Sequence, residues 1–314
     1  MTSFIVKRLS ALVPVWLLVS LIAFGVMHLA PGDPASVILG QEATPEAIEH
    51  LRVALGLNRP LYLQFAVWLG RVFKGDLGNS IFLDKPVLAA LLERLPVTAW
   101  ITACALCVAL LVGIPAGILA SIKRRGPMAP LVMVVSLLGL STPEFLVGLS
   151  LLYIFSVALG WLPLGGFVSP VAEPLEALKH LLMPSITLGL AQVALIARMT
   201  RSSMLEVLDS DYVRTARSKG LAEGVVVMRH ALRNALIPVI TVIGMAIASL
   251  LAGTFVTESV FNLPGMGSLV IMAVKRRDYP LIQGGMLVVS TFTMIANLLV
   301  DIAYVYLDPR IKYE

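Results

Sequence analysis

The chain has 314 residues, of which 58% are hydrophobic and 14% are charged, whereas an average soluble domain is about 25% charged. Its mean hydropathy of +0.90 indicates an integral membrane protein. The apolar runs are long and uninterrupted, which excludes a β-barrel and leaves helices as the spanning elements. The net charge is only +5, and no basic cluster is interleaved with aromatic residues, so the sequence excludes nucleic acid as a partner.

Residues 9–30 form the first apolar span, directly after Lys7 and Arg8. The span is longer than the apolar region of a signal peptide, and no small-residue cleavage site follows it. We therefore expect a retained transmembrane helix that residues 31–34, Pro-Gly-Asp-Pro, bring to an end.

Residues 31–95 are the least apolar part of the chain. Thr44 is placed to cap a helix that has Pro45 at its first position and ends at Gly56. A second helix is expected to open at Pro60, and a third covers residues 86–95. All three are amphipathic and too short to span a bilayer, so we expect them on the membrane surface or over one end of the bundle.

The rest of the chain contains the other long apolar segments. We expect spans at residues 96–122, 129–159, 180–199, 235–257 and 284–307, with loops at 160–179 and 258–283. Gly113 and Gly117 have the spacing that allows two helices to approach closely, either in ordinary packing or at a specific dimer face. Cys104 and Cys107 lie in an apolar helix without a second ligand pair, so we interpret them as packing thiols.

The predicted fold is an all-α polytopic membrane protein with six transmembrane helices. It divides into a first helix at 1–30, an extracytoplasmic helical segment at 31–95, and a five-helix core at 96–314 that includes a cytoplasmic loop at 200–234. Both termini are placed in the cytoplasm because Lys and Arg gather at the cytoplasmic ends of short connections. Three basic residues at 275–277 lie on the other side and conflict with this orientation.

The polar stretch 198–233 separates two apolar spans and carries both acidic and basic residues. Its middle, 216–219, is predicted to be helical, with Gly220 ending the helix and a second short helix following at about 221–233. Two short helices around a glycine predict a compact protrusion that faces water and contacts a partner.

Motifs for catalysis are absent from the sequence. There is no G-x-x-x-x-G-K-[ST] phosphate loop, no H-E-x-x-H and no G-x-S-x-G. The histidines have no metal-ligand spacing; they are His28, His50, His180 and His230. We therefore expect no enzymatic activity, no metal site and no cofactor in this chain.

Two carboxylates fall within predicted spans, Glu144 in the third and Asp301 in the sixth. A charged side chain in hydrocarbon costs roughly 3 kcal/mol on insertion scales, so each is a candidate for lining a translocation pathway. The alternative is that each bonds a neighbouring helix or a wet cavity for structural reasons.

The polar stretch resembles the coupling loop of ATP-binding-cassette importer permeases, the EAA motif. The residues that align with the motif are Arg214-Thr215-Ala216-Arg217-Ser218-Lys219-Gly220 and His230-Ala231-Leu232-Arg233. Ala216, Gly220 and Leu232 match the motif. Arg214, His230 and Arg233 stand where the motif has glutamate, isoleucine and proline. The version here, DYVRTARSKG and HALRNALIP, is similar to that of the peptide/nickel branch. Other segments resemble the same branch in order along the chain, namely PGDP at 31–34, GDLGNS at 75–80, FNLPGMG at 261–267, RDYP at 277–280 and DPRI at 308–311.

The resemblance implies the first permease subunit of a di- or oligopeptide importer in the bacterial inner membrane. It implies as partners a second permease, two cytoplasmic subunits that bind the ATP, and an extracytoplasmic solute-binding protein. It assigns contact with the ATPase to Arg214, Thr215, Ala216, Arg217, Lys219, Gly220, Leu221, His230 and Leu232. Nickel chelates and glutathione remain alternative cargoes, and a self-sufficient secondary carrier remains an alternative of another class.

Overall fold

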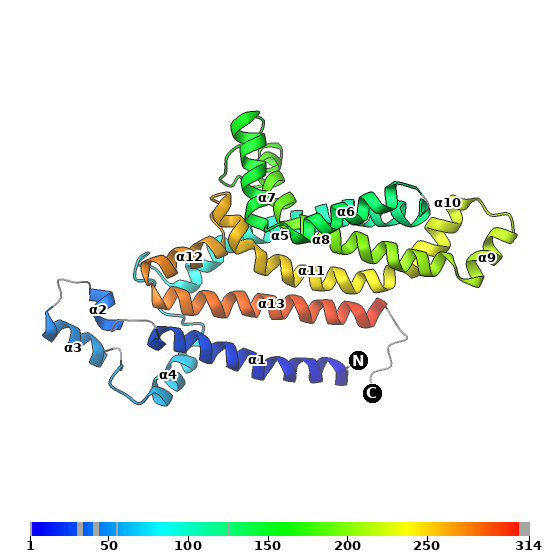
Figure 1. The fold of residues 1–314 in the computed structure, drawn as a ribbon. Helices are drawn as coiled ribbons and strands as arrows, with labels where there is room; N and C mark the ends of the chain where they lie inside the picture. The colour runs from blue at the N-terminus through cyan, green and yellow to red at the C-terminus, as the bar shows by residue number, and fades with distance from the viewer. Residues whose placement is uncertain (1, 30–33, 40–43, 55, 125, 308–314) are drawn as a thin grey trace. The chain divides into compact units, whose positions relative to one another are not determined.

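The computed structural model describes residues 2–29, 34–39, 44–54, 56–124 and 126–307. Helices dominate it, and across these ranges the extended pairing is limited to an isolated bridge between Asn79 and Pro86 (Figure 1). The predicted break at residues 31–33 and the DPRI segment at 308–311 lie outside the described residues.

The chain forms two compact units. The first contains Val97–Pro264 and the C-terminal end from Ala296, and the second contains Thr2–Pro96 and Gly265–Ile295. The predicted division by membrane location, at 1–30, 31–95 and 96–314, stays a prediction.

The first unit is built around helix α8, Pro174–Leu208, which packs against α11 (Leu232–Val260), α6 (Met128–Ser141) and α7 (Glu144–Leu151). The part of α5 (Val87–Ile122) from Val97 onward belongs to the same unit. Its apolar core takes side chains from α5, α8 and α11, including Ile101, Met183 and Leu250.

The predicted glycine spacing on α5 serves packing within the chain. A Cβ atom added to Gly117 would lie 2.6 Å from the carbonyl oxygen of Ala197 and 2.6 Å from the Cβ of Thr200. A Cβ on Gly113 would lie 3.0 Å from the carbonyl oxygen of Val193. These two glycines therefore bring α5 close to α8, as small residues do at helix contacts in membranes.

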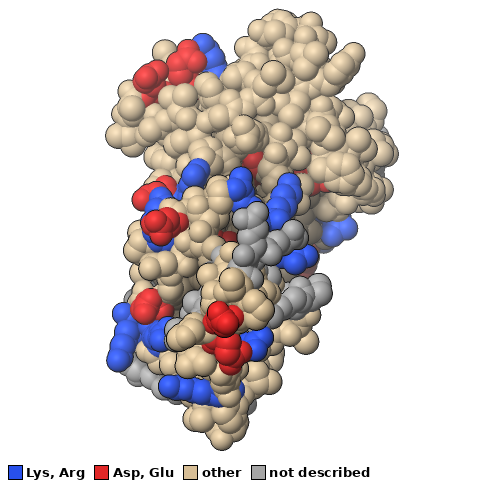
Figure 2. All heavy atoms as spheres, turned by 90° about the vertical axis from the view of Figure 1, so that its left-hand side faces the viewer, with Lys and Arg blue, Asp and Glu red and all other residues tan. Residues whose placement is uncertain are grey.

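The second unit contains α1 (Thr2–Leu29), α2 (Pro34–Leu39), α3 (Pro45–Ala54), α4 (Leu61–Phe73), α12 (Met266–Arg276) and most of α13 (Tyr279–Leu307). Helix α1 packs on α4 through the rings of Phe24, Phe65 and Trp68, whose centroids are 5.4–6.1 Å apart. In the lower part of Figure 2, over α2 to α4, acidic and basic side chains are interspersed, as expected of a segment that meets water.

Two predictions for the start of this unit are confirmed, the first apolar helix and the helix capped by Thr44. Helix α1 has a span-length apolar segment at Arg8–Leu29. Helix α3 begins at Pro45, and the backbone N–H of Ala47 donates to Oγ1 of Thr44 over 3.3 Å, which is an N-cap contact.

The predicted bounds of two long helices, α5 and α8, are wrong. The helix predicted at 86–95 and the span at 96–122 are one helix, α5, which continues through Pro96. Proline removes one backbone hydrogen bond, and packed membrane helices tolerate this loss. Helix α8 starts at Pro174 rather than near residue 180, and it passes Pro184 without a break.

The span predicted at 129–159 is not one straight helix. Its two halves, Ala129–Ser141 and Glu144–Ala158, meet at an angle of 103°. The break falls before Pro143, whose ring disfavours the α conformation at the preceding Thr142. The region predicted as a loop at 258–283 is also wrong in part, because α12 occupies Met266–Arg276.

In the described ranges, five helices are long and apolar enough to cross a bilayer, and the bent pair brings the number to six if its halves form one span. This agrees with the predicted polytopic helical fold. The exposed side of α6 is aliphatic, with Leu131, Val134 and Leu138 more than half exposed, as suits a face covered by lipid or a neighbouring subunit.

Candidate functional site

The loop between α8 and α11 is a folded element. Helix α9 spans Asp211–Ser218, and a second helical segment follows as α10 (Glu223–Val225) and the π-helical turn η2 (Val226–Ala231), which runs directly into α11. Gly220 lies between them with φ of +75°, a left-handed conformation that glycine adopts without strain. The prediction of a short helix that ends at Gly220 is confirmed, whereas the second predicted short helix is wrong, because the segment after Gly220 is the start of one continuous helix, Glu223–Val260.

A small apolar core holds the loop together. Its buried members come from the end of α8, from α9 and η2, and from the start of α11: Met204, Leu208, Val213, Ala216, Val226, Val227, Ala231 and Ala235. Ile118 of α5 packs against the same cluster. Because this core joins the loop to three long helices, a force applied to the loop reaches all of them.

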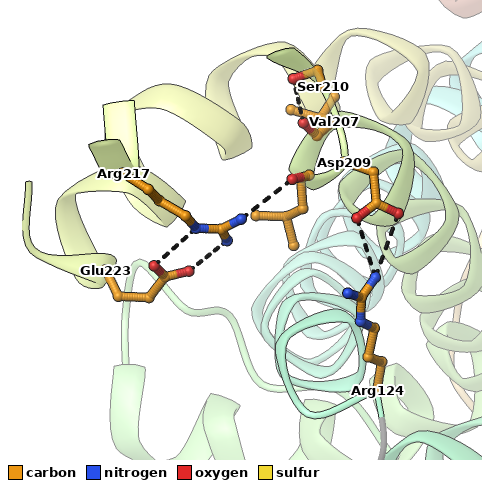
Figure 3. Close-up of polar contacts among 7 residues, drawn as sticks. Arg124, Val207, Asp209, Ser210, Arg217 and Glu223 are labelled. Carbon is orange, nitrogen blue, oxygen red and sulfur yellow. Dashed lines mark hydrogen bonds and ion pairs between the residues drawn. The ribbon is translucent and has the colours of Figure 1, made fainter. Parts of the chain in front are cut away.

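Ion pairs reinforce the loop (Figure 3). Arg217 donates to both oxygens of Glu223, over 3.1 Å from Nε and 2.7 Å from a terminal nitrogen, and so bridges the Gly220 turn. This hydrogen bond raises the pKa of the Arg217 guanidinium. Arg124, just after α5, pairs with Asp209 at 3.2 Å and ties the base of the loop to the end of α5. Exposed pairs of this kind are worth about 0.2–1 kcal/mol each, so they orient the loop more than they stabilise it.

The predicted coupling residues divide into two sets. Ala216 is buried and Leu232 is half-buried, and both pack in the loop's own core. His230 is half-buried. The remaining members are exposed: Arg214, Thr215, Arg217, Lys219, Gly220 and Leu221. Contact of these exposed residues with an ATPase stays a prediction.

The loop exposes three apolar side chains after Gly220, of which the sequence analysis named Leu221 and missed Val225 and Met228. Leu221, Val225 and Met228 are 40%, 42% and 59% exposed. Leu221 lies just before α10, whereas Val225 ends α10 and Met228 lies in η2. We name these three residues the apolar strip.

Glu144 is the first residue of α7, directly after the bend, and is half-buried. Its carboxylate accepts a hydrogen bond from the hydroxyl of Thr257 on α11. A Cβ on Gly253 would lie 3.3 Å from a carboxylate oxygen of Glu144, so α11 approaches closely here. Asp301 belongs to α13, and its side chain lies outside the described residues.

Two further buried carboxylates were not singled out from the sequence. Glu258 is fully buried and accepts a hydrogen bond from the hydroxyl of Thr98 over 2.6 Å. In the second unit, Asp278 is 1% exposed and accepts from the hydroxyl of Ser80 over 2.5 Å. Glu258 lies in the last turn of α11 and Asp278 lies between α12 and α13, positions where an acidic residue is normally taken for a solvated end.

The described residues contain no group of three His, Cys, Asp or Glu side chains that is arranged to hold a metal ion. Cys104 is half-buried and Cys107 is exposed, and both are free thiols. The candidate site therefore consists of the folded loop and the Glu144 contact.

These features define a multi-pass helical membrane protein with a folded, solvent-exposed loop between two of its long helices. The chain belongs to the family of inner membrane components of binding-protein-dependent transport systems, whose main part matches residues 113–313 and whose N-terminal part matches residues 1–102. It is accordingly a multi-pass protein of the inner membrane, and the members of its family are components of transport systems. Membership implies ATP-binding subunits and a solute-binding protein as partners.

Relatives of known name extend over the whole chain. The dipeptide transport system permease DppB of Alkalihalophilus pseudofirmus is 42% identical, and the glutathione transport system permease GsiC of Escherichia coli O6:H1 is 41% identical, each covering all of both chains. A permease-containing structure of the MetNI methionine ABC transporter in an inward-facing conformation has a TM-score of 0.56. It is 14% identical and covers 70% of this chain and 97% of that chain, so the likeness shows the fold.

Proposed function

We propose that this chain is one of two permease subunits of an ATP-driven importer and forms half of a translocation pathway for short peptides. The observation that carries the proposal is the full-length likeness to the dipeptide permease. Two cytoplasmic subunits bind and hydrolyse the ATP, an extracytoplasmic protein delivers the solute, and this chain catalyses no reaction. Both termini and the loop between α8 and α11 lie in the cytoplasm.

The loop is the contact with an ATPase subunit. The apolar strip and the exposed residues from Arg214 to Leu221 cover its outer side, while its inner side belongs to the core shared with α8 and α11. A rigid element held at both ends can pass a rigid-body movement of the ATPase into the spans, which alternating access requires.

Glu144 and Asp301 are the proposed pathway carboxylates. Glu144 stands at the bend between α6 and α7 and bonds α11, so a change in its contact with Thr257 would accompany a movement between those helices. Glu144→Gln keeps the shape and removes the charge. We expect a slower uptake rate at unchanged complex assembly; an unchanged rate and specificity would remove Glu144 from the pathway.

Glutathione is the second candidate cargo, favoured by the 41% identical glutathione permease. Nickel chelates and a self-sufficient carrier are weaker candidates. The deciding experiment reconstitutes the chain with its partner subunits in vesicles and measures uptake of labelled dipeptides, glutathione and a nickel chelate. We expect peptide uptake that stops with a non-hydrolysable nucleotide and persists when the proton gradient is collapsed. Uptake by this chain alone would refute the proposal.

The coupling role has its own test. Gly220→Leu forces a side chain into a left-handed conformation, whereas Gly160→Leu places the same strain, at φ of +64°, in the loop before α8. We expect Gly220→Leu to assemble normally and to lower uptake per ATP hydrolysed by at least tenfold, with Gly160→Leu near wild type. Met228→Asp is expected to weaken ATPase binding, because it puts a charge in the apolar strip.

A further inference from the structure

Helix α4 has one exposed side that the proposed transport role does not use. This side consists of positions 62, 66, 70 and 73 in one row and positions 63, 67, 71 and 74 in the next, and all of these positions are exposed. Within each row the residues are three or four positions apart, so they lie on one side of the helix. We name these two rows the outer face.

Most of the outer face is apolar. Tyr62 and Phe73 are each 71% exposed, and Leu63 and Val67 are 43% and 44% exposed. A Cβ atom added to Gly70 would meet nothing within 4 Å, so no other described part of the chain covers the middle of the face. Single exposed apolar residues are ordinary on a protein surface, but a contiguous apolar face marks a place of contact.

The inner side of α4 packs against a membrane span. Helix α4 lies beside α1 (Figure 1), with the ring of Trp68 5.7 Å from that of Phe24 and the ring of Phe73 5.4 Å from that of Trp16. Phe24 and Trp16 both belong to the span-length apolar segment of α1, Arg8–Leu29. At 13 residues, α4 is too short to cross a bilayer itself. Because α4 is held against the flank of a span, its apolar outer face is placed to meet lipid.

Two cations stand together at the end of the outer face. Arg71 lies in the last turn of α4 and Lys74 is its C-cap, one helical turn further on. Helix α4 contains no acidic residue, and within the described residues neither cation has a carboxylate at ion-pair distance. The next acidic residue along the chain is Asp76, whose carboxylate accepts the backbone N–H of Gly78 over 2.9 Å. Arg71 and Lys74 are therefore available to an anion from outside the chain.

The chemistry of this face matches a phospholipid with a negative headgroup. The planar fork of an arginine suits a phosphate, and a lysine adds a second positive charge. Both side chains have long apolar stems, which lie along hydrocarbon while the charged ends reach the headgroups. One anionic phospholipid would use the cations with its phosphate and the apolar rows with its acyl chains. A zwitterionic lipid carries its own cation beside the phosphate, which offsets this pairing.

We propose that the outer face of α4 binds an anionic phospholipid of the surrounding membrane. The headgroup phosphate pairs with Arg71 and Lys74, and the acyl chains lie along Leu63 and Val67. This inference goes beyond the transport function and depends neither on the cargo nor on the loop between α8 and α11.

The test uses the full chain in lipid vesicles. Cys104 and Cys107 are replaced by Ala, and Ala66→Cys, in the middle of the outer face, carries a bimane fluorophore. The probes are phosphatidylglycerol and phosphatidylcholine with brominated acyl chains, which quench the fluorophore on contact. Quenching against the mole fraction of each lipid gives their relative affinity for the face. We expect phosphatidylglycerol to bind at least fivefold more tightly, since a cation close to an anionic headgroup contributes about that factor.

Variants locate the preference. Arg71→Gln combined with Lys74→Gln should bring the affinity ratio of the two lipids close to one, while Arg71→Lys combined with Lys74→Arg keeps both charges and should retain most of it. The matched control is Lys123→Gln combined with Arg229→Gln, which removes two exposed cations from the first unit. This control should leave the ratio as it is in the parent protein.

Four outcomes would overturn the proposal. Quenching by neither lipid would show that the face does not meet the bilayer, and equal quenching by both would remove the headgroup from the site. An equal loss of preference in the control variant would reduce the effect to the net charge of the chain. Quenching that disappears when the second permease is assembled with this chain would show that a protein covers the face instead of lipid.

Discussion

Arg217 and Glu223 join the two helical segments on either side of Gly220. Reversing the charge of one partner places like charges together, so we expect Arg217→Glu and Glu223→Arg each to lower uptake per ATP hydrolysed several-fold. The exposed pair is worth only about 0.2–1 kcal/mol, so expression should hold. The double exchange restores the pair and should recover most of the coupling, measured in the reconstituted complex. A double variant no better than the singles would mean that Arg217 acts through direct contact with the ATPase.

The carboxylate of Asp278 accepts three hydrogen bonds within the second unit. It accepts from the hydroxyl of Ser80 and from the backbone N–H groups of Phe82 and Leu281, at 2.5, 3.1 and 3.2 Å. Asp278→Ala leaves these donors without their acceptor, which should cost about 3 kcal/mol or more. The thermal midpoint in detergent is expected to fall by several degrees, while Asp211→Ala, at a position 97% exposed, leaves it in place. Equal midpoints for the two variants would contradict the assignment.

Single residues show where sequence reasoning succeeds and where it stops. Gly220 was predictable, because a glycine between two helical stretches indicates a left-handed turn. The burial of Glu258 and Asp278 was not, since it depends on Thr98 and Ser80, 160 and 198 residues away in sequence. No local pattern encodes such partners.

Among the elements, contacts between long helices depend on small residues. Gly117→Ala would bring a methyl group to 2.6 Å from backbone and Cβ atoms of α8, which cannot move aside cheaply. We expect a loss of about 1–3 kcal/mol in stability, read as a lower midpoint of thermal unfolding in detergent. Gly70→Ala, in α4, meets nothing within 4 Å and should gain about 0.5–1 kcal/mol. If the two variants unfold alike, the close approach of α5 and α8 is wrong.

The helix boundaries that were predicted least well from the sequence are those next to prolines. Pro96 and Pro184 lie inside continuous helices, whereas Pro143 follows a 103° bend. Inside a helix, as at Pro96 and Pro184, a proline removes one backbone hydrogen bond, whereas Pro143 is the N-cap of α7, where no such bond is lost. At Pro143 the carboxylate of Glu144 bonds Thr257 on α11, a contact that favours a new helix direction.

For the whole molecule, composition alone predicted a polytopic helical membrane protein, because long apolar runs have few alternatives in a bilayer. The order of the motifs then predicted the family, which the matches over residues 1–102 and 113–313 confirm. The cargo could not be derived in this way, since selectivity depends on side-chain positions around a pathway and on a separate binding protein.

Membrane orientation is the remaining whole-molecule prediction, and it follows from the distribution of Lys and Arg. Cys104 and Cys107 are the only two cysteines, so replacing both with Ala gives a background for single-cysteine labelling. A membrane-impermeant maleimide applied to intact cells with a permeabilised outer membrane should label Lys74→Cys in the segment after α4. Lys219→Cys, in the loop between α8 and α11, should react only after the inner membrane is opened. The chain is expressed without its ATPase subunits, so that a docked partner cannot shield the loop from the reagent. Labelling of Lys219→Cys in intact cells would show that the loop lies outside the cytoplasm, which would contradict the predicted orientation and the proposed contact with an ATPase.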